Sequence, residues 1–244
     1  MKPFFNYFGG KWRSSPFYPS PEHDVIIEPF AGAAGYSVRR SQGKKVLLYD
    51  KSEAVIGVWN YLIKAKVKQI LALPDIKFGT KVADPIYKLC QEEKDWIGFW
   101  MNTGCVSPRK SPCAFFDPAK KPEYSDFLWG ERLRRRTAKQ LKNIRHWKAE
   151  VASFEDIPNQ KACWFIDPPY QDHVKWYPHS NKNIDFNMLG SWCVDRRGQY
   201  IVCEGAGADW LPFKPFRRIQ SKKGHATELI YTNSSYYEQV SLFS

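Results

Sequence analysis

The feature that most constrains the fold is an apolar run, Trp-Phe-Ile at residues 164–166, which stops at Asp-Pro-Pro-Tyr, residues 167–170. Three apolar residues in a row predict the end of a buried strand. The two prolines end that strand because proline fixes φ and has no N–H donor. Asp167 and Tyr170 are therefore expected on a rigid turn at the carboxyl end of a strand, which is where open α/β sheets bind ligands.

This turn suits chemistry on the exocyclic amine of a nucleobase. Such an amine is a poor nucleophile, because its lone pair is delocalised into the ring. Acceptors aimed at its two hydrogens, here the Asp167 carboxylate and the Pro168 carbonyl, favour a pyramidal nitrogen whose lone pair can attack. Tyr170 is expected to stack on a base that has left its helix. The alternative is a Pro-Pro strand terminator with a surface Asp and a packing Tyr.

Composition points to a polyanionic partner. The 244 residues carry a net charge of +12 and 16% of them are aromatic, which suits binding to DNA or RNA. The six cysteines contain no Cys-x-x-Cys pair, so we expect a reduced, intracellular protein. With no signal-peptide pattern and no apolar run long enough to span a bilayer, we expect a soluble protein and no membrane partner. His173 and His179 have no Cys or acid at ligand spacing, so no metal is expected.

Two further strands are predicted upstream. Residues 25–27, Val-Ile-Ile, lead into small residues and a helix start at 28–37, the layout of a nucleotide-type cofactor site. The spacing is not Gly-x-Gly-x-x-Gly, which argues against a pyrophosphate-binding dinucleotide site. Residues 45–50 predict a second strand that ends in Asp50, about where an acid reaches ribose hydroxyls in such folds. The alternatives are glycines that serve only helix–sheet packing, and an Asp50 or Ser52 that caps the next helix.

At the N-terminus, aromatic residues precede Gly-Gly-Lys at 9–11. Two glycines let the backbone pass close to a ligand, and Lys11 is placed to meet a carboxylate. A flexible N-terminal loop is the alternative. Later elements are predicted as a helix over 85–101, a basic helix within 131–148, a helix over 186–197, a strand at 200–203 and hairpin strands at 216–220 and 227–232.

Taken in order, these motifs resemble the Dam-type DNA adenine-N6 methyltransferases. The resemblance rests on Gly-Gly-Lys at 9–11, Glu-Pro-Phe-Ala-Gly at 28–32, the strand-ending Asp50, and Asp-Pro-Pro-Tyr at 167–170. It covers roughly residues 4–60 and 144–244. It implies an α/β, Rossmann-like S-adenosylmethionine methyltransferase fold, in which a mostly parallel central sheet has helices on both faces and a C-terminal β-hairpin. Residues 1–60 and 150–244 would form the catalytic domain, and 61–149 a helical insertion for DNA target recognition.

The resemblance also assigns site residues. The cofactor would be S-adenosylmethionine, with Lys11 near its carboxylate, Asp50 on its ribose and Phe154 against its adenine. The full set expected to bind it is Tyr7, Gly10, Lys11, Glu28, Phe30, Gly32, Asp50, Phe154 and Asp167, and the catalytic set is Asp167, Pro168, Pro169 and Tyr170. The family more often has Gly where Ala34 stands and Asn where Ser52 stands, which bears on cofactor affinity.

Basic side chains are the candidates for DNA contacts. One group lies in the Gly-, Pro- and Ser-containing loop 104–112, and another forms a stripe opposite the apolar side of the predicted basic helix. The candidates are Arg109, Lys110, Arg132, Arg135, Lys139, Lys142, Arg217 and Lys222. A solvated connector and a solvated helix face are the alternatives. Residues 171–177 are a candidate lid over the flipped base.

The expected function is therefore methylation of adenine N6 in double-stranded DNA, by base flipping and direct methyl transfer without a metal. The expected enzyme is a monomer, or a dimer on DNA, in the cytoplasm of a bacterial or phage-infected cell. Guanine-N2 methylation of RNA, cytosine-N4 methylation and a catalytically silent nucleic-acid-binding module remain as alternatives. The sequence fixes neither the recognition site nor any role in restriction–modification.

Overall fold

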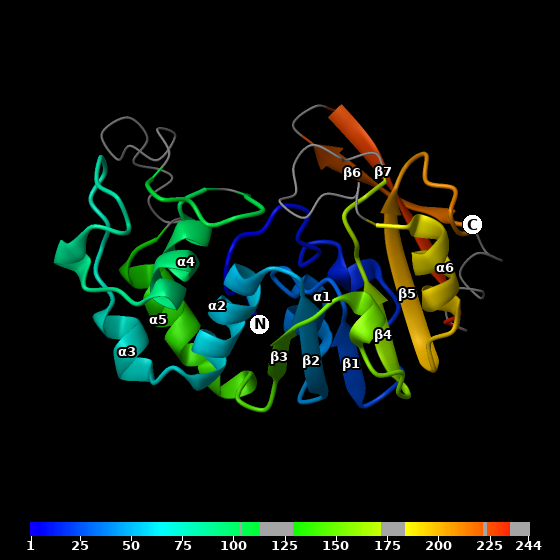
Figure 1. Ribbon diagram of the computed structural model, residues 1–244, viewed down its shortest axis with the longest axis horizontal. Coiled ribbons are helices and arrows are strands. Elements are labelled where there is room, and N and C mark those ends of the chain that lie inside the picture. The colour runs from blue at the N-terminus through cyan, green and yellow to red at the C-terminus, as the bar shows by residue number, and fades with distance from the viewer. Residues whose placement is uncertain (103, 113–128, 172–183, 222–223, 235–244) are drawn as a thin grey trace.

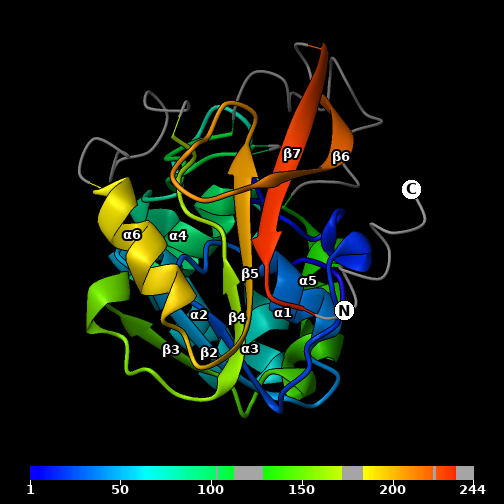
Figure 2. The same cartoon turned by 90° about the vertical axis from the view of Figure 1, so that its right-hand side faces the viewer.

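The computed structural model describes residues 1–102, 104–112, 129–171, 184–221 and 224–234 (Figures 1 and 2). One seven-stranded sheet has the order β3-β2-β1-β4-β5-β7-β6. The strands are β1 Val25–Glu28, β2 Lys45–Asp50, β3 Lys148–Val151, β4 Ala162–Ile166, β5 Gly198–Gly205, β6 Lys214–Ser221 and β7 Gly224–Thr232. The α-helices are α1 Gly35–Arg40, α2 Glu53–Lys64, α3 Val67–Ala72, α4 Gln91–Trp100, α5 Glu131–Gln140 and α6 Phe186–Val194.

The strands from β1 to β5 are parallel, and β7 lies antiparallel between β5 and β6. This is a mostly parallel, Rossmann-like sheet with a C-terminal hairpin, so the predicted fold class is confirmed. The strand order reverses between β1 and β4, because the chain winds outward to β3 before it crosses to β4. A crevice at the carboxyl ends of β1 and β4 is where such a sheet binds ligands.

Apolar side chains cover both faces of the sheet. Along β4 all five residues are buried, as expected of a central parallel strand. Phe165 packs into the larger core with α1, α2, α4 and α5, whereas Trp164 and Ile166 pack into a second core with α6. The two faces are thus both covered by helices, and Figure 1 shows α3, α4 and α5 gathered beyond the β3 edge of the sheet.

The N-terminal segment is fastened to these helices. Trp96 and Trp100 of α4 both donate their indole N–H to the carbonyl oxygen of Phe4, at 2.7 and 2.9 Å. Phe4 and Phe5 are fully buried, and the Phe5 ring stacks on Phe99 of the same helix with ring centroids 5.0 Å apart. The backbone just before Gly-Gly-Lys therefore has a fixed position.

Three predicted helices differ from the observed ones. The helix predicted at 85–101 is interrupted, because Lys88 takes a left-handed conformation with φ 49° between a short 3-10 turn and α4. The helix predicted at 186–197 ends at Val194. The basic helix ends at Gln140, and β3, which was not predicted, begins at Lys148. Between them the chain forms a 3-10 turn, Leu141–Asn143, and β3 then pairs with β2.

The other predicted strands are confirmed with longer bounds. The strand predicted at 200–203 is the centre of β5, and those predicted at 216–220 and 227–232 lie within β6 and β7. The turn between β6 and β7, at 222–223, lies outside the described residues. None of the described helices is both long and apolar enough to cross a membrane.

Candidate cofactor and catalytic site

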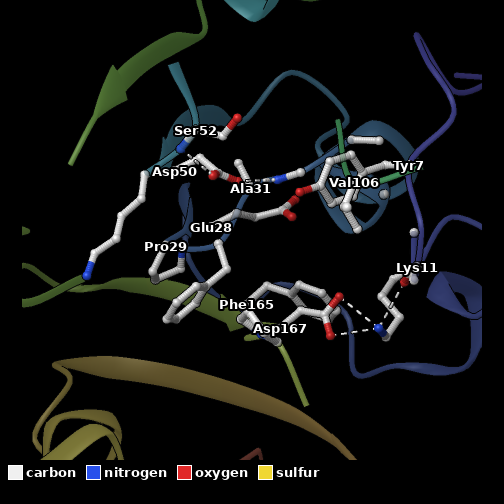
Figure 3. Close-up of a pocket in the computed structure, with 18 of the residues that line it drawn as sticks. Tyr7, Lys11, Glu28, Pro29, Ala31, Asp50, Ser52, Val106, Phe165 and Asp167 are labelled. Carbon is white, nitrogen blue, oxygen red and sulfur yellow. Dashed lines mark hydrogen bonds and ion pairs between the residues drawn. The ribbon is translucent and has the colours of Figure 1, made fainter. Parts of the chain in front are cut away.

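A cavity of about 270 Å³ opens at the carboxyl ends of β1, β2 and β4. Figure 3 shows Lys11 and Asp167 on one side of it, with Asp50 and Ser52 on another. The nine residues expected to bind the cofactor all line this cavity, and they are Tyr7, Gly10, Lys11, Glu28, Phe30, Gly32, Asp50, Phe154 and Asp167. Five segments that are distant in the sequence therefore meet at one place.

The residues after β1 are small because the N-terminal segment passes close to them. Gly32 has φ 45°, and a Cβ there would lie 2.9 Å from Cδ1 of Tyr7. A Cβ on Gly35 would lie 2.4 Å from the backbone nitrogen of Trp12, which leaves no room for a side chain. Ala34 also has a left-handed φ of 46°, which costs an L-residue about 1–2 kcal/mol relative to glycine. This explains why glycine suits position 34.

Asp50 joins the ends of the first two strands. Its Oδ2 accepts from the backbone N–H of Gly32 and its Oδ1 from that of Ser52, both at 2.9 Å. The cap of α2 is Ser52, whose hydroxyl oxygen accepts from the N–H of Val55 at 3.4 Å. Asp50 is therefore not the helix cap, and its carboxylate is held at the wall of the cavity.

Two aromatic rings form an apolar wall. The ring centroids of Phe30 and Phe154 lie 5.7 Å apart, and Phe154 is 2% exposed. Phe154 sits in a 3-10 turn, Phe154–Asp156, between β3 and β4, and packs edge-on against Trp192 of α6. The second core fixes this wall from behind, which leaves a flat apolar surface for a ring system.

The opposite wall carries a buried ion pair. The Lys11 ammonium donates to Oδ1 and Oδ2 of Asp167 at 2.6 and 2.7 Å, and to the carbonyl of Gly9 at 3.0 Å. Burial raises the pKa of Asp167 to about 6, against the opposing effect of Lys11. Burial is the largest single effect on Lys11 and acts to lower its pKa, but Asp167, Tyr170, Cys203 and Glu228 together outweigh it, so that pKa lies well above its ordinary value.

Glu28 is a second buried acid in this cavity. It ends β1, is 2% exposed, and its Oε1 accepts from the N–H of Ser37 at 2.8 Å. Burial raises its pKa to about 8, so Glu28 is largely protonated at neutral pH. Two of the acids that line the cavity, Glu28 and Asp167, therefore have raised pKa values and differ in the pH at which they ionise.

The Asp-Pro-Pro-Tyr motif follows β4 as a turn. Asp167 and Pro169 line the cavity, whereas Pro168 is buried. Tyr170 lies behind them, with Lys11 4.9 Å from the centre of its ring and its hydroxyl 3.4 Å from Oε1 of Glu228. The acceptors on Asp167 thus adjoin the cavity, while the Tyr170 ring lies beyond them.

Sequence reasoning missed two buried acids beside this turn. Glu204 near the end of β5 accepts from the N–H groups of Gln171 and Gly205, at 2.9 and 2.6 Å, and from Trp210 at 3.2 Å. Glu228 on β7 is 2% exposed. An acid that directly follows an apolar strand was a visible signal for Glu204, as it was for Glu28 and Asp50. Glu228 lies inside a polar-looking hairpin and had no such signal.

The candidate DNA contacts are not gathered at one place. Arg109 and Lys110 are exposed in a loop whose Val106 lines the cavity. Arg217 is half-buried, with its guanidinium 4.2 Å from the ring centre of Phe17. Lys222 lies outside the described residues, as do residues 172–177 of the candidate lid.

The stripe on α5 leads away from the cavity. Its exposed members are Arg132, Arg135, Lys139 and, in the 3-10 turn after α5, Lys142. Arg145, expected to continue the stripe, instead donates to the carbonyls of Ile63 and Ala65 at the end of α2. Because α2 starts at the carboxyl edge of the sheet and β3 begins at the amino edge, residues 139–145 lie toward the amino edge. Arg134 is also buried, ion-paired with Asp75 at 2.6 Å.

No protein-family model matches the chain, and no curated protein matches it. Among solved structures, a conserved hypothetical protein of Streptococcus pyogenes is similar at 8% identity and TM-score 0.36, over 88% of each chain. "Putative methyltransferase yhhF" from Escherichia coli is similar at 10% identity and TM-score 0.34, over 85% of this chain and 74% of that one. "Putative methylase HI0767" from Haemophilus influenzae is similar at 13% identity and TM-score 0.36, over 94% and 91%. Function is therefore inferred from the geometry of the cavity.

Proposed function

We propose that the chain is an S-adenosylmethionine-dependent DNA methyltransferase that acts on the N6 amine of adenine. One observation carries this proposal. The nine side chains and glycines that a cofactor of this kind would contact line a single cavity, and that cavity ends at the carboxylate of Asp-Pro-Pro-Tyr. Neither half of this arrangement serves the folded core, because the Lys11–Asp167 ion pair and the buried acid Glu28 cost desolvation energy there.

The residues present fit the cofactor. Asp50 would accept from the ribose hydroxyls, the Phe30 and Phe154 wall would hold the adenine ring, and Lys11 is the cation for the carboxylate. Gly32 has no Cβ, so the cofactor could approach its backbone closely. The N–H of Gly32 is already bonded to Asp50. When bound, S-adenosylmethionine supplies an electrophilic methyl group at this end of the cavity.

The role of the chain in transfer is to hold the amine and strengthen it as a nucleophile. The ionised Asp167 carboxylate and the Pro168 carbonyl would accept the two amine hydrogens, so the nitrogen lone pair is no longer shared with the ring. The two prolines keep these acceptors in place without any covalent intermediate. Tyr170 would stack on the adenine after it has left the duplex.

The DNA partner follows from charge. A net charge of +12 favours a polyanion, and exposed Arg109 and Lys110 stand in the loop that reaches the cavity through Val106. Phosphate contacts from such a loop would position the duplex without selecting its sequence. The helical segment 61–149 is the part of the chain that we assign to target recognition.

The direct test is a product analysis. The purified protein is incubated with methylation-free duplex DNA and methyl-labelled S-adenosylmethionine, the DNA is digested to nucleosides, and the labelled nucleoside is identified. N6-methyladenine is the expected product, and Asp167→Ala is the control that should leave none. N4-methylcytosine would overturn the choice of base. Label in RNA alone would overturn the DNA substrate, and no binding of S-adenosylmethionine in a calorimeter would leave a nucleic-acid-binding module.

A further inference from the structure

A buried carboxylate on the C-terminal hairpin, that of Glu228, contacts Tyr170 of the Asp-Pro-Pro-Tyr turn. Glu228 of β7 is 2% exposed, and its Oε1 lies 3.4 Å from the hydroxyl of Tyr170 and 3.8 Å from the ammonium of Lys11. Its Oε2 is buried and has no hydrogen-bond partner among the described residues. A buried carboxylate that keeps one oxygen unpaired is costly, so its presence calls for an explanation other than packing.

The strand next to Glu228 makes room for Tyr170. Gly205 of β5 is paired with Glu228 across the sheet, and a Cβ on Gly205 would lie 3.0 Å from Cδ2 of Tyr170. The Tyr170 ring therefore lies against the bare backbone of β5, and its hydroxyl reaches the neighbouring strand β7. Only a residue without a side chain at position 205 allows this contact without displacement of the ring.

We propose that Glu228 is a positioning residue for methyl transfer, which fixes the Tyr170 ring by its hydroxyl and shares the Lys11 ammonium with Asp167. This inference rests on the proposed function. It adds a residue on the C-terminal hairpin to a site that is otherwise built from the N-terminal loop and the segments after β1, β2, β3 and β4.

The proposed role of Glu228 follows from the hydrogen bonds that the Lys11 ammonium donates. An ammonium has three N–H groups, and those of Lys11 bond the two oxygens of Asp167 and the Gly9 carbonyl. When Asp167 accepts hydrogens from a target amine, its bonds to Lys11 weaken. Glu228, 3.8 Å from the ammonium, is then the protein carboxylate that, together with the cofactor carboxylate assigned to Lys11, keeps this ammonium paired, so that Lys11 competes less with the amine for Asp167.

The electrostatic consequence can be measured. The negative charge of Glu228 raises the pKa of Asp167, while Lys11 lowers it. The other titratable groups that interact with this cluster are Tyr18, Glu28, Tyr170, Cys203 and Glu204. Removal of the charge at position 228 alone should therefore let Asp167 ionise at lower pH.

The test is Glu228→Gln, which keeps the shape and removes the charge. We expect kcat to fall on the order of 10- to 100-fold, as for a misplaced catalytic group, with KM for S-adenosylmethionine changed less than about twofold. The acidic limb of the pH–rate profile should move to lower pH. Glu228→Asp, which keeps the charge but shortens the side chain, should retain the wild-type limb while losing rate. Unchanged kcat in Glu228→Gln would overturn the proposal.

Two further variants separate the parts of the role. Gly205→Ala displaces the Tyr170 ring from the other side without a change of charge, so it should lower kcat and leave the pH limb in place. Glu150→Gln, an exposed acid on β3, is the surface control and should change neither. If Gly205→Ala moved the limb as Glu228→Gln does, the separate electrostatic role would be refuted.

One readout does not depend on turnover. The ionisation of Asp167 can be followed by carbon-13 NMR of the labelled carboxyl group, in the wild-type protein and in Glu228→Gln. A lower pKa in the variant supports the proposed coupling even if the wild type transfers no methyl to DNA, in which case only the proposed function fails. An unchanged titration overturns the coupling of Glu228 to Asp167 whatever the substrate is.

Discussion

Lys11 donates to both carboxylate oxygens of Asp167, at 2.6 and 2.7 Å, across 156 residues of sequence. The pair joins the N-terminal Gly-Gly-Lys loop to the turn after β4, so the loop that lines the cavity and the turn that holds the proposed acceptor share one contact. The side chain of Lys11 is buried, and that of Asp167 is 19% exposed. A substitution of either Lys11 or Asp167 should therefore affect both the loop and the turn.

The rate of methyl transfer should depend on the ionisation of Asp167. Its raised pKa of about 6 predicts that kcat falls about tenfold per pH unit below that value, because the protonated acid loses an acceptor. Lys11→Met removes the cation that opposes burial, so the acidic limb should move to higher pH. Single-turnover rates measured between pH 5 and 8 in the wild type and in Lys11→Met would check both predictions. If the acidic limb of Lys11→Met moved to lower pH, the effect of Lys11 on the pKa of Asp167 would be refuted.

Asp167→Ala should abolish turnover while DNA binding stays largely intact. Asp167→Asn keeps one carbonyl acceptor in the same shape, so it should lose on the order of 100-fold in kcat and retain a measurable rate. Single-turnover assays at saturating DNA, with binding measured separately by fluorescence anisotropy, separate the two properties. Loss of DNA binding with a normal rate at saturation would show that Asp167 is not the acceptor.

Gly32→Ala should weaken cofactor binding more than its cost in stability explains. Its φ of 45° lies in the left-handed region, and its Cβ would press on the Tyr7 ring, which lines the cavity. Gly43→Ala is the matched control, since Gly43 has φ 89° but no atom within 4 Å of an added Cβ. We expect each to lose about 1–2 kcal/mol of stability, and only Gly32→Ala to lose affinity for S-adenosylmethionine, by tenfold or more. Calorimetry that finds equal affinities would exclude the clash.

Glu28 should make the free energy of unfolding depend on pH. Its folded pKa, about 8, lies above its ordinary value of 4.5, so folding favours the protonated acid. That stabilisation is complete below pH 4.5 and is lost as the pH rises through 8, on the order of 5 kcal/mol at about 1.4 kcal/mol per pH unit. Glu28→Gln cannot ionise and its amide oxygen can still accept from Ser37, so its urea unfolding should be less pH-dependent. If the free energies of unfolding of the two proteins changed with pH in the same way, the raised pKa of Glu28 would be refuted.

The loop beside the cavity should matter more for DNA affinity than the end of α5. Arg109→Ala with Lys110→Ala should lower the slope of log affinity against log salt by about 1.8, which is two phosphates at about 0.9 each. Lys139→Ala with Lys142→Ala, toward the amino edge of the sheet, should have a smaller effect. Anisotropy titrations at several salt concentrations would measure both slopes, and a larger loss from the α5 pair would move the DNA path to that face.

Much of the candidate site could be predicted from sequence because parallel strands end at a common edge. Acids and small residues after residues 25–27, 45–50 and 164–166 were expected near one another, and the structure brings them into one cavity. Lys11 could be placed there only by the resemblance, since nothing local to a Gly-Gly-Lys loop says which strand it faces.

What could not be predicted depends on distant contacts. Strand β3 buries only Ala149 of its four residues, so it has no apolar run and exists through pairing with β2. Arg134 and Arg136 look like the rest of the basic run, yet their guanidinium groups lie over the rings of Trp129 and Trp100. In the sequence, long side chains of this kind cannot be distinguished from exposed charges until the packing of the helix is known.

The paired indole bonds from Trp96 and Trp100 to Phe4 bear on how such a protein can be recombined. The helices that we assign to target choice hold the backbone that leads into Lys11, so they cannot be exchanged as an independent cassette. A chimera that imports a foreign helical segment would need the matching first eleven residues as well. Selectivity and chemistry in this chain would then be inherited together.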